Sequence, residues 1–126
     1  MVAGGLLAAA STSTVDAKSR QEVRFYKVNK DGISQRLRFT TKKSRRAGCH
    51  NLIKKARIHK VSHFGYAYCE VFQSSDCLEE SKMQFAHDKV EESQTQLSQG
   101  YGWQPIGEHE RGEKMKSWRC VAEPQN

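Results

Sequence analysis

The chain has no long hydrophobic run, no close pair of cysteines and almost no acidic residues in its first half. Its longest apolar run, residues 2–10, is far shorter than the about 20 residues that a membrane-spanning helix needs, so no membrane span is expected. No convincing amphipathic helical periodicity and no internal linker occur along the 126 residues. These absences favour a single domain without helices and exclude an integral membrane protein of the helical type.

The scarcity of acidic residues leaves one half of the chain strongly positive. Residues 18–60 hold 15 lysines and arginines against two acidic residues, a net charge of +13, whereas residues 61–126 carry −5. A folded protein with such a charge distribution presents a positive region, which attracts polyanions or acidic protein surfaces.

The N-terminal 17 residues resemble a secretory signal peptide. Leu6 to Ala10 form a short apolar segment, and Val15-Asp16-Ala17 offers the small residues that a signal peptidase requires. No lysine or arginine precedes the apolar segment, so the positive start typical of a signal is missing. We expect a signal peptide over residues 1–17, a mature domain over 18–126 and an extracellular location.

The four cysteines support export. They are even in number and widely spaced in a short chain, which is typical of a two-disulfide framework in a secreted protein. Three connectivities fit the sequence. The preferred one pairs Cys49 with Cys120 and closes a tight loop between Cys69 and Cys77.

Alternation of side chains predicts several short strands. Residues 22–28 and 33–39 alternate on both sides of the turn signal Asp31-Gly32, which predicts a hairpin. Residues 78–99 are expected to form a weak strand and loops with at most one helical turn. Further strands are expected over residues 56–63, 66–72 and 115–121. About six short strands with turn-rich connections favour an all-β sandwich or barrel stapled by two disulfides.

The expected binding residues lie on this hairpin and in the loop after it. Tyr26 of the same hairpin could stack on bases or sugars. A group of cations that neutralises several phosphates or sulfates binds with a steep salt dependence. The candidate binding residues are Arg24, Arg36, Arg38, Lys42, Lys43, Arg45 and Arg46.

One loop contains the residue types of a ribonuclease site. Glu108, His109 and Arg111 supply a base, an acid and a phosphate-stabilising cation within four residues, with His50 or His59 as a second proton carrier. A solvated charged turn is the more ordinary interpretation of the same residues.

The spacing of His59 and His63 is seen in zinc sites, but structural zinc sites bring cysteine ligands as a close pair, and this chain has none. No metal and no cofactor are therefore expected, and the histidines are expected on a basic surface.

Five short segments follow one another over residues 48–120: Gly48-Cys49-His50-Asn51-Leu52, Val61-Ser62-His63-Phe64, Cys69-Glu70-Val71-Phe72, Asp76-Cys77 and Lys116-Ser117-Trp118-Arg119-Cys120. In this order they resemble small secreted fungal proteins with a βγ-crystallin-like Greek-key fold. That resemblance implies two four-stranded Greek-key motifs packed as a sandwich. Many such proteins bind calcium, but Ser74-Ser75 lacks the acidic pair upstream, so calcium binding is not expected.

Together these features predict a small Greek-key sandwich or barrel that is secreted, monomeric and acts by binding. The expected partner is an acidic protein surface or a polyanion such as a cell-wall polymer or RNA, in an effector-like role toward a host. Two alternatives remain open: a secreted basic ribonuclease, and an intracellular nucleic-acid-binding protein with free thiols.

Overall fold

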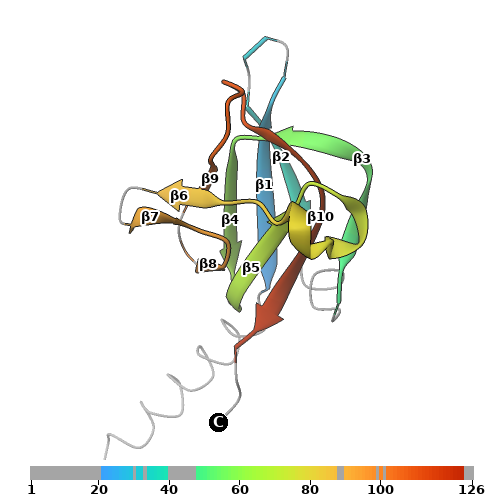
Figure 1. The fold of residues 1–126 in the computed structure, drawn as a ribbon, viewed down its shortest axis with the longest axis vertical. Coiled ribbons are helices and arrows are strands. Elements are labelled where there is room, and N and C mark those ends of the chain that lie inside the picture. Colours follow the sequence, from blue (N-terminus) through green and yellow to red (C-terminus); the bar gives the residue numbers. More distant parts are fainter. Residues whose placement is uncertain are drawn as a thin grey trace, which may run out of the picture.

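Ten strands and two short 3₁₀ turns make up the part of the chain that the structure describes (Figure 1). The computed structural model describes residues 21–29, 31–32, 34–39, 48–87, 90–98, 100 and 102–123. The elements are β1 (Glu22–Val28), β2 (Ser34–Phe39), β3 (His50–Ile58), β4 (Lys60–Phe64), β5 (Tyr66–Phe72), η1 (Ser75–Cys77), η2 (Glu79–Ser81), β6 (Phe85–His87), β7 (Val90–Gln94), β8 (Leu97–Ser98), β9 (Gln104–Pro105) and β10 (Glu113–Ala122).

The strands form three antiparallel sheets. Their orders are β2-β1-β4, β3-β10-β5-β8 and β7-β6-β9. The last strand, β10, lies between β3 and β5, so the chain returns at its end to a sheet that it began much earlier. Greek-key arrangements use long-range connections of this kind. The predicted all-β class is therefore confirmed. No helical segment among the described residues is long and apolar enough to cross a membrane.

The three sheets are joined along their edges. Only His59 separates β3 from β4, so one bent strand takes part in two sheets. Val61 and Trp103 exchange main-chain hydrogen bonds of 2.7 Å, which links β4 to the segment entering β9. Met83 N–H donates to the Val71 oxygen at 2.8 Å, which links the segment entering β6 to β5. The sheets thus wrap around one interior.

A single hydrophobic cluster fills this interior. Both tryptophans belong to it: Trp103 is 0% exposed and Trp118 is 1% exposed. Ile58 and Val61, on either side of the bend at His59, are fully buried. The other buried members are Val23, Phe25, Tyr66, Cys69, Val71, Met83, Phe85, Leu97 and Met115.

The hairpin, β5 and the last strand form where the sequence predicts them. The strand expected over 56–63 begins earlier, at His50, and is broken by the bend at His59. Residues 78–99 contain the η2 turn and three short strands rather than mostly loops. The apolar residues of this segment are irregularly spaced because its strands are too short to show a clear alternation.

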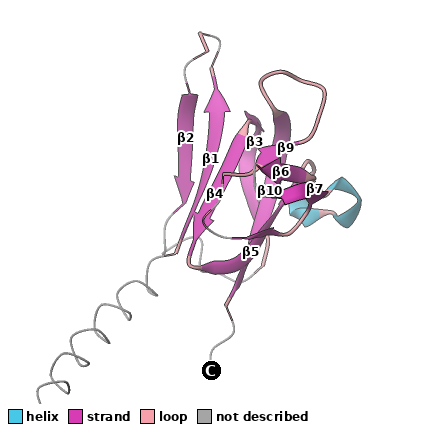
Figure 2. Cartoon of the chain, turned by 90° about the vertical axis from the view of Figure 1, so that its left-hand side faces the viewer, coloured by secondary structure: helices cyan, strands magenta, loops and turns pink. Residues whose placement is uncertain are grey.

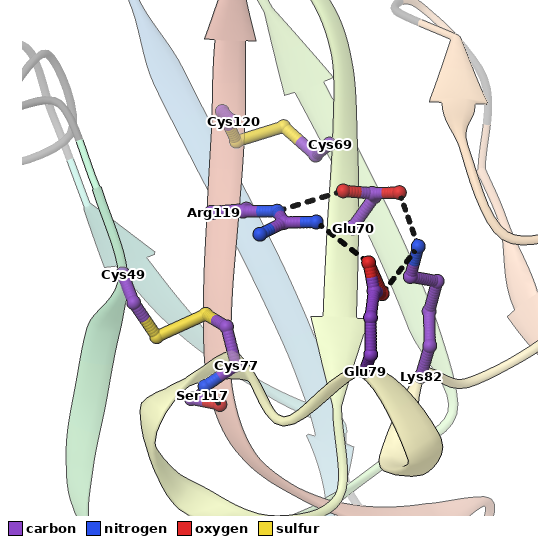
Figure 3. Close-up of polar contacts among 9 residues, drawn as sticks. All are labelled: Cys49, Cys69, Glu70, Cys77, Glu79, Lys82, Ser117, Arg119 and Cys120. Carbon is purple, nitrogen blue, oxygen red and sulfur yellow. Dashed lines mark hydrogen bonds and ion pairs between the residues drawn. A yellow bond between two sulfur atoms is a disulfide. The ribbon is translucent and has the colours of Figure 1, made fainter.

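The four cysteines form two disulfides, but the preferred pairing was wrong. The bonds are Cys49–Cys77 and Cys69–Cys120 (Figure 3). Register decides the second bond, because Cys69 of β5 lies directly opposite Cys120 of β10 with Cα atoms 4.0 Å apart. β5 continues to Phe72, and η1 then carries Cys77 to the start of β3, 5.8 Å from Cys49 between Cα atoms.

Candidate functional site

The register of the β2-β1-β4 sheet gathers basic residues into neighbouring rows. Arg24 is paired with Arg38 on one side and Ser62 on the other. One row along, Tyr26 is paired with Arg36 and Lys60. Residues directly opposite each other in a sheet share one face, so these two rows lie next to each other. Figure 2 shows the three strands side by side.

This face is the outer one because the alternate residues of β1 are core residues. Val23 and Phe25 are fully buried, while Arg24 and Tyr26 between them are only half-buried. We call the outward set Arg24, Tyr26, Arg36, Lys60 and Phe64 the basic sheet face. It combines three cations with two aromatic rings.

Cations and rings are in contact on the basic sheet face. Lys60 Nζ lies 4.3 Å from the centre of the Tyr26 ring, and the Arg24 guanidinium carbon lies 5.1 Å from that of Phe64. Arg24 also forms an ion pair with Glu22. Cation–π contacts at exposed sites contribute about 0.5–1 kcal/mol each.

Arg36 is the most available cation of this face. Its side chain is exposed and forms no ion pair with any residue that the structure describes. Since Glu22 carries one negative charge and the basic sheet face carries three cations, the face keeps a positive charge. Arg38 occupies the register position opposite Arg24, and four predicted binding residues, Lys42, Lys43, Arg45 and Arg46, lie outside the described residues.

His59 borders the basic sheet face at the bend between β3 and β4. Its Nε2 lies 3.2 Å from Ser34 Oγ, and its ring meets the Tyr26 ring edge-on at 6.5 Å between centroids. Burial, and then the neighbouring Lys60 ammonium, lower the pKa of His59. Its imidazole is therefore mostly neutral near pH 7 and adds little positive charge.

The residues of the ribonuclease hypothesis form the turn that leads into β10. His109 Nδ1 accepts the Arg111 N–H at 3.1 Å, and His109 N–H donates to Glu113 Oε2 at 3.2 Å. Arg111 Nη1 donates to the Asn29 oxygen at 3.4 Å. Glu108 and His109 are exposed, as in the solvated charged turn. The first two bonds lie within the turn, and the third joins it to the residue after β1.

The second proton carriers of that hypothesis lie at opposite ends of β3. Glu113, which follows the turn, is paired with Ile58, next to His59. His50 is paired with Trp118 and stacks on its indole at 4.4 Å. The turn is thus near His59, whereas His50 lies opposite Trp118, five residues of β10 or about 17 Å further along the sheet.

His63 departs from the expectation that the histidines lie on the surface. It is 0% exposed, and its Nε2–H donates to the Leu97 oxygen while its ring packs against Tyr66. Within the described residues its Nδ1 has no hydrogen-bond partner. Burial lowers the pKa of His63, so this histidine is a neutral core residue. No group of three or more potential metal ligands occurs among the described residues.

Sequence reasoning missed an ion-pair network between β5, η2 and β10. The Glu70 carboxylate is almost fully buried and accepts hydrogen bonds from Arg119 Nε at 2.8 Å and Lys82 Nζ at 2.9 Å. Glu79 accepts from the same two cations at 3.4 and 2.7 Å (Figure 3). The feature of the sequence that could have indicated this network is an acidic residue, Glu70, between Cys69 and Val71, which are both buried.

The network is neutral as a whole, with two acids and two bases. The hydrogen bonds that Lys82 donates to Glu79 and then to Glu70 raise the pKa of Lys82, and the bond to Glu79 lowers the pKa of that carboxyl. The pKa shifts of Glu79, Lys82 and Arg119 all favour their charged forms near neutral pH. The arrangement of the four groups indicates a structural role and leaves the basic sheet face as the candidate binding site.

Comparisons with protein-family models, with curated proteins and with solved structures found no match. The crystallin-like resemblance therefore stays a prediction.

Proposed function

We propose that this chain is a secreted protein that acts by binding an anionic polymer, such as a cell-wall polymer or RNA, on its basic sheet face. The observation that carries this proposal is the two-row arrangement of Arg24, Arg36 and Lys60 with the rings of Tyr26 and Phe64. In the effector-like role that we propose, that polymer belongs to a host or to the cell wall.

The chemistry of the face suits an extended chain with repeated negative groups. Outward residues on one strand are about 6.6 Å apart, and neighbouring strands are about 4.8 Å apart, so the cations present a regular array. Phosphates, sulfates and carboxylates of a polymer can each meet one cation. Sugars or bases can lie over Tyr26 or Phe64 when a cation moves from the ring to an anion.

Export is supported by the two disulfides. Such bonds form and persist in oxidising compartments and are rare in the cytosol. The predicted signal peptide, residues 1–17, lies outside the described residues.

A salt series of binding measurements tests the proposal. Affinity for a sulfated polysaccharide and for single-stranded RNA is measured for the wild type, Arg36→Gln and Lys60→Gln. Lys114→Gln is the matched control, because Lys114 is an exposed lysine of β10, outside the basic sheet face. Each substitution on the face should reduce the slope of log affinity against log salt by about 0.7 for a single strand. The control should leave the slope unchanged.

Equal affinities for all three variants would contradict the proposal. The same RNA is analysed for cleavage with His109→Ala as a control. Cleavage that depends on His109 would replace a binding role by the ribonuclease alternative. Binding without His109-dependent cleavage is the result that we expect.

A further inference from the structure

The pairing of β3 with β10 is interrupted by an outward bulge. Ala56 is paired with Met115 and Asn51 with Ser117, so Lys116 alone faces the four residues 52–55. The Lys116 ammonium donates to the main-chain oxygens of Leu52 at 2.6 Å and Ile53 at 2.8 Å. These bonds fix the backbone of the bulge.

The bulge carries the most exposed large hydrophobic side chain among the described residues. Ile53 is 95% exposed, and the exposed Lys54 and Lys55 follow it. Bulges and lysines on an edge strand prevent pairing with other chains, which accounts for the bulge and its charges. Edge protection does not account for an isoleucine presented to solvent. We call Ile53, Lys54 and Lys55 the lysine patch.

A segment of opposite charge has the same pattern. Leu78 is 47% exposed and is followed by the exposed Glu79 and Glu80. Glu79 is partly neutralised by Lys82 and Arg119, as Figure 3 shows, but Glu80 forms no ion pair with a described residue. We call Leu78, Glu79 and Glu80 the glutamate patch. Each patch is an aliphatic residue followed by two like charges.

Two hydrogen bonds join the segments that carry the two patches. Asn51 Nδ2 donates to Asp76 Oδ1 at 2.9 Å, and Asp76 N–H donates to Asn51 Oδ1 at 2.7 Å. The lysine patch begins two residues after Asn51, and the glutamate patch begins two residues after Asp76. The Cys49–Cys77 disulfide ties the same two segments, which lie on one side of the molecule (Figure 1).

The glutamate side of this arrangement is firmly held. Asp76 and Cys77 have positive φ angles of 61° and 50°, which residues other than glycine adopt only where their surroundings enforce them. Cys77 N–H donates to Ser117 Oγ at 3.0 Å, and the same hydroxyl donates to the Ser74 oxygen. Both patches are thus presented on a backbone fixed by hydrogen bonds, which lowers the entropic cost of association.

We propose that a second copy of this chain binds here and forms a two-fold dimer. In such an interface the lysine patch of each copy contacts the glutamate patch of the other copy. A face with one positive and one negative patch is therefore complementary to a second copy of itself. Each Ile53 then packs near the partner's Leu78 while lysines meet glutamates. The inference departs from the monomer that the sequence predicts and does not depend on the basic sheet face.

Sedimentation velocity measures the fraction of dimer. The oxidised full chain is analysed over a concentration series at low and at high salt. Low salt should favour it, because its charge pairs are exposed and screened by salt. Ile53→Ser should weaken it at least about tenfold, since a side chain buried at the interface is lost in each copy. Ile106→Ser is the matched control, because Ile106 is 55% exposed outside both patches.

Charge reversal gives the sharpest readout. Lys54→Glu with Lys55→Glu should abolish the dimer, although it lowers the net charge of +7 by four units and so weakens general repulsion. Glu80→Lys should also dissociate it. An equimolar mixture of the two variants should restore a mixed dimer, because one of its two contacts is native and the other has both charges reversed.

Three results would overturn the proposal. The first is a monomer at every concentration and salt. The second is a dimer that survives both Ile53→Ser and the double lysine reversal. The third is a dimer that the reversed variants lose separately and that their mixture does not restore.

Discussion

The substitution Glu70→Gln removes the carboxylate at the centre of the network between β5 and β10. Glu70 is 2% exposed and receives hydrogen bonds from Arg119 Nε at 2.8 Å and Lys82 Nζ at 2.9 Å (Figure 3). Glutamine keeps the shape of the side chain but not its charge. The glutamine amide has one oxygen, which accepts, and one NH₂ group, which donates. One of the two cations, which can only donate, therefore faces a donor in place of an acceptor.

The expected loss of stability follows from how buried the partners are. Removing one member of a fully buried ion pair costs about 3–5 kcal/mol. Here the Lys82 and Arg119 side chains are 21% and 35% exposed, so water and the remaining Glu79 partly compensate them. We therefore expect a decrease of about 2 kcal/mol in the free energy of unfolding. In a domain of this size that corresponds to a fall in Tm of about 10 °C.

Urea unfolding, followed by the fluorescence of the buried Trp103 and Trp118, measures this change without screening the charges. Glu92→Gln is the control, because this exposed glutamate of β7 belongs to no ion pair among the described residues, and it should change stability by less than about 0.5 kcal/mol. A Glu70→Gln variant as stable as the control would refute the structural role of the network.

Three further predictions concern the core, one turn and one disulfide. Burial lowers the pKa of His63 below 6.5, so the unfolded chain binds the extra proton first. The free energy of unfolding should therefore fall below about pH 6.5, by up to about 1.4 kcal/mol per pH unit, until the folded state also takes up the proton. Urea titrations of wild type and His63→Asn measure this, and an equal pH dependence in both contradicts it. Gly112→Ala places a Cβ 1.7 Å from a main-chain oxygen of β3 at a φ of +94°, and thermal unfolding should show a loss of at least about 2 kcal/mol. Gly32→Ala, with a positive φ but open space, should cost about 1 kcal/mol, and equal losses at the two glycines would be inconsistent with the clash. Replacing Cys69 and Cys120 by serine opens a loop of 51 residues, with an expected loss of about 4 kcal/mol in non-reducing urea unfolding. A loss below about 1 kcal/mol would contradict that estimate.

The local part of the fold was predictable from sequence. The hairpin of β1 and β2 follows from strand alternation on both sides of Asp31-Gly32, where Gly32 N–H donates to the Asn29 oxygen at 3.1 Å. Its register then places Arg24 opposite Arg38 and Tyr26 opposite Arg36. Much of the basic sheet face therefore depends on contacts that are close in sequence. Lys60 was missed because β4 reaches β1 only through the tertiary fold.

Features that depend on distant segments were not predictable. The disulfide pairing requires the path of η1, in which Asp76 and Cys77 adopt a left-handed backbone that their residue types do not indicate. The Glu70 network joins residues 49 positions apart, Glu70 and Arg119, and no local pattern links them. His63 was assigned to the surface because a histidine in a basic segment is usually solvated, whereas this one lies on the inner side of β4.

The most direct test of the central claim is an NMR titration of the isotope-labelled protein with a sulfated oligosaccharide and with single-stranded RNA. Chemical-shift changes report which amides contact the ligand without any substitution. The account predicts that the largest changes occur in β1, β2 and β4, at Arg24, Tyr26, Arg36 and Lys60. Changes confined to the turn of residues 108–112 or to β5 and β10, with β1, β2 and β4 unaffected, would contradict it.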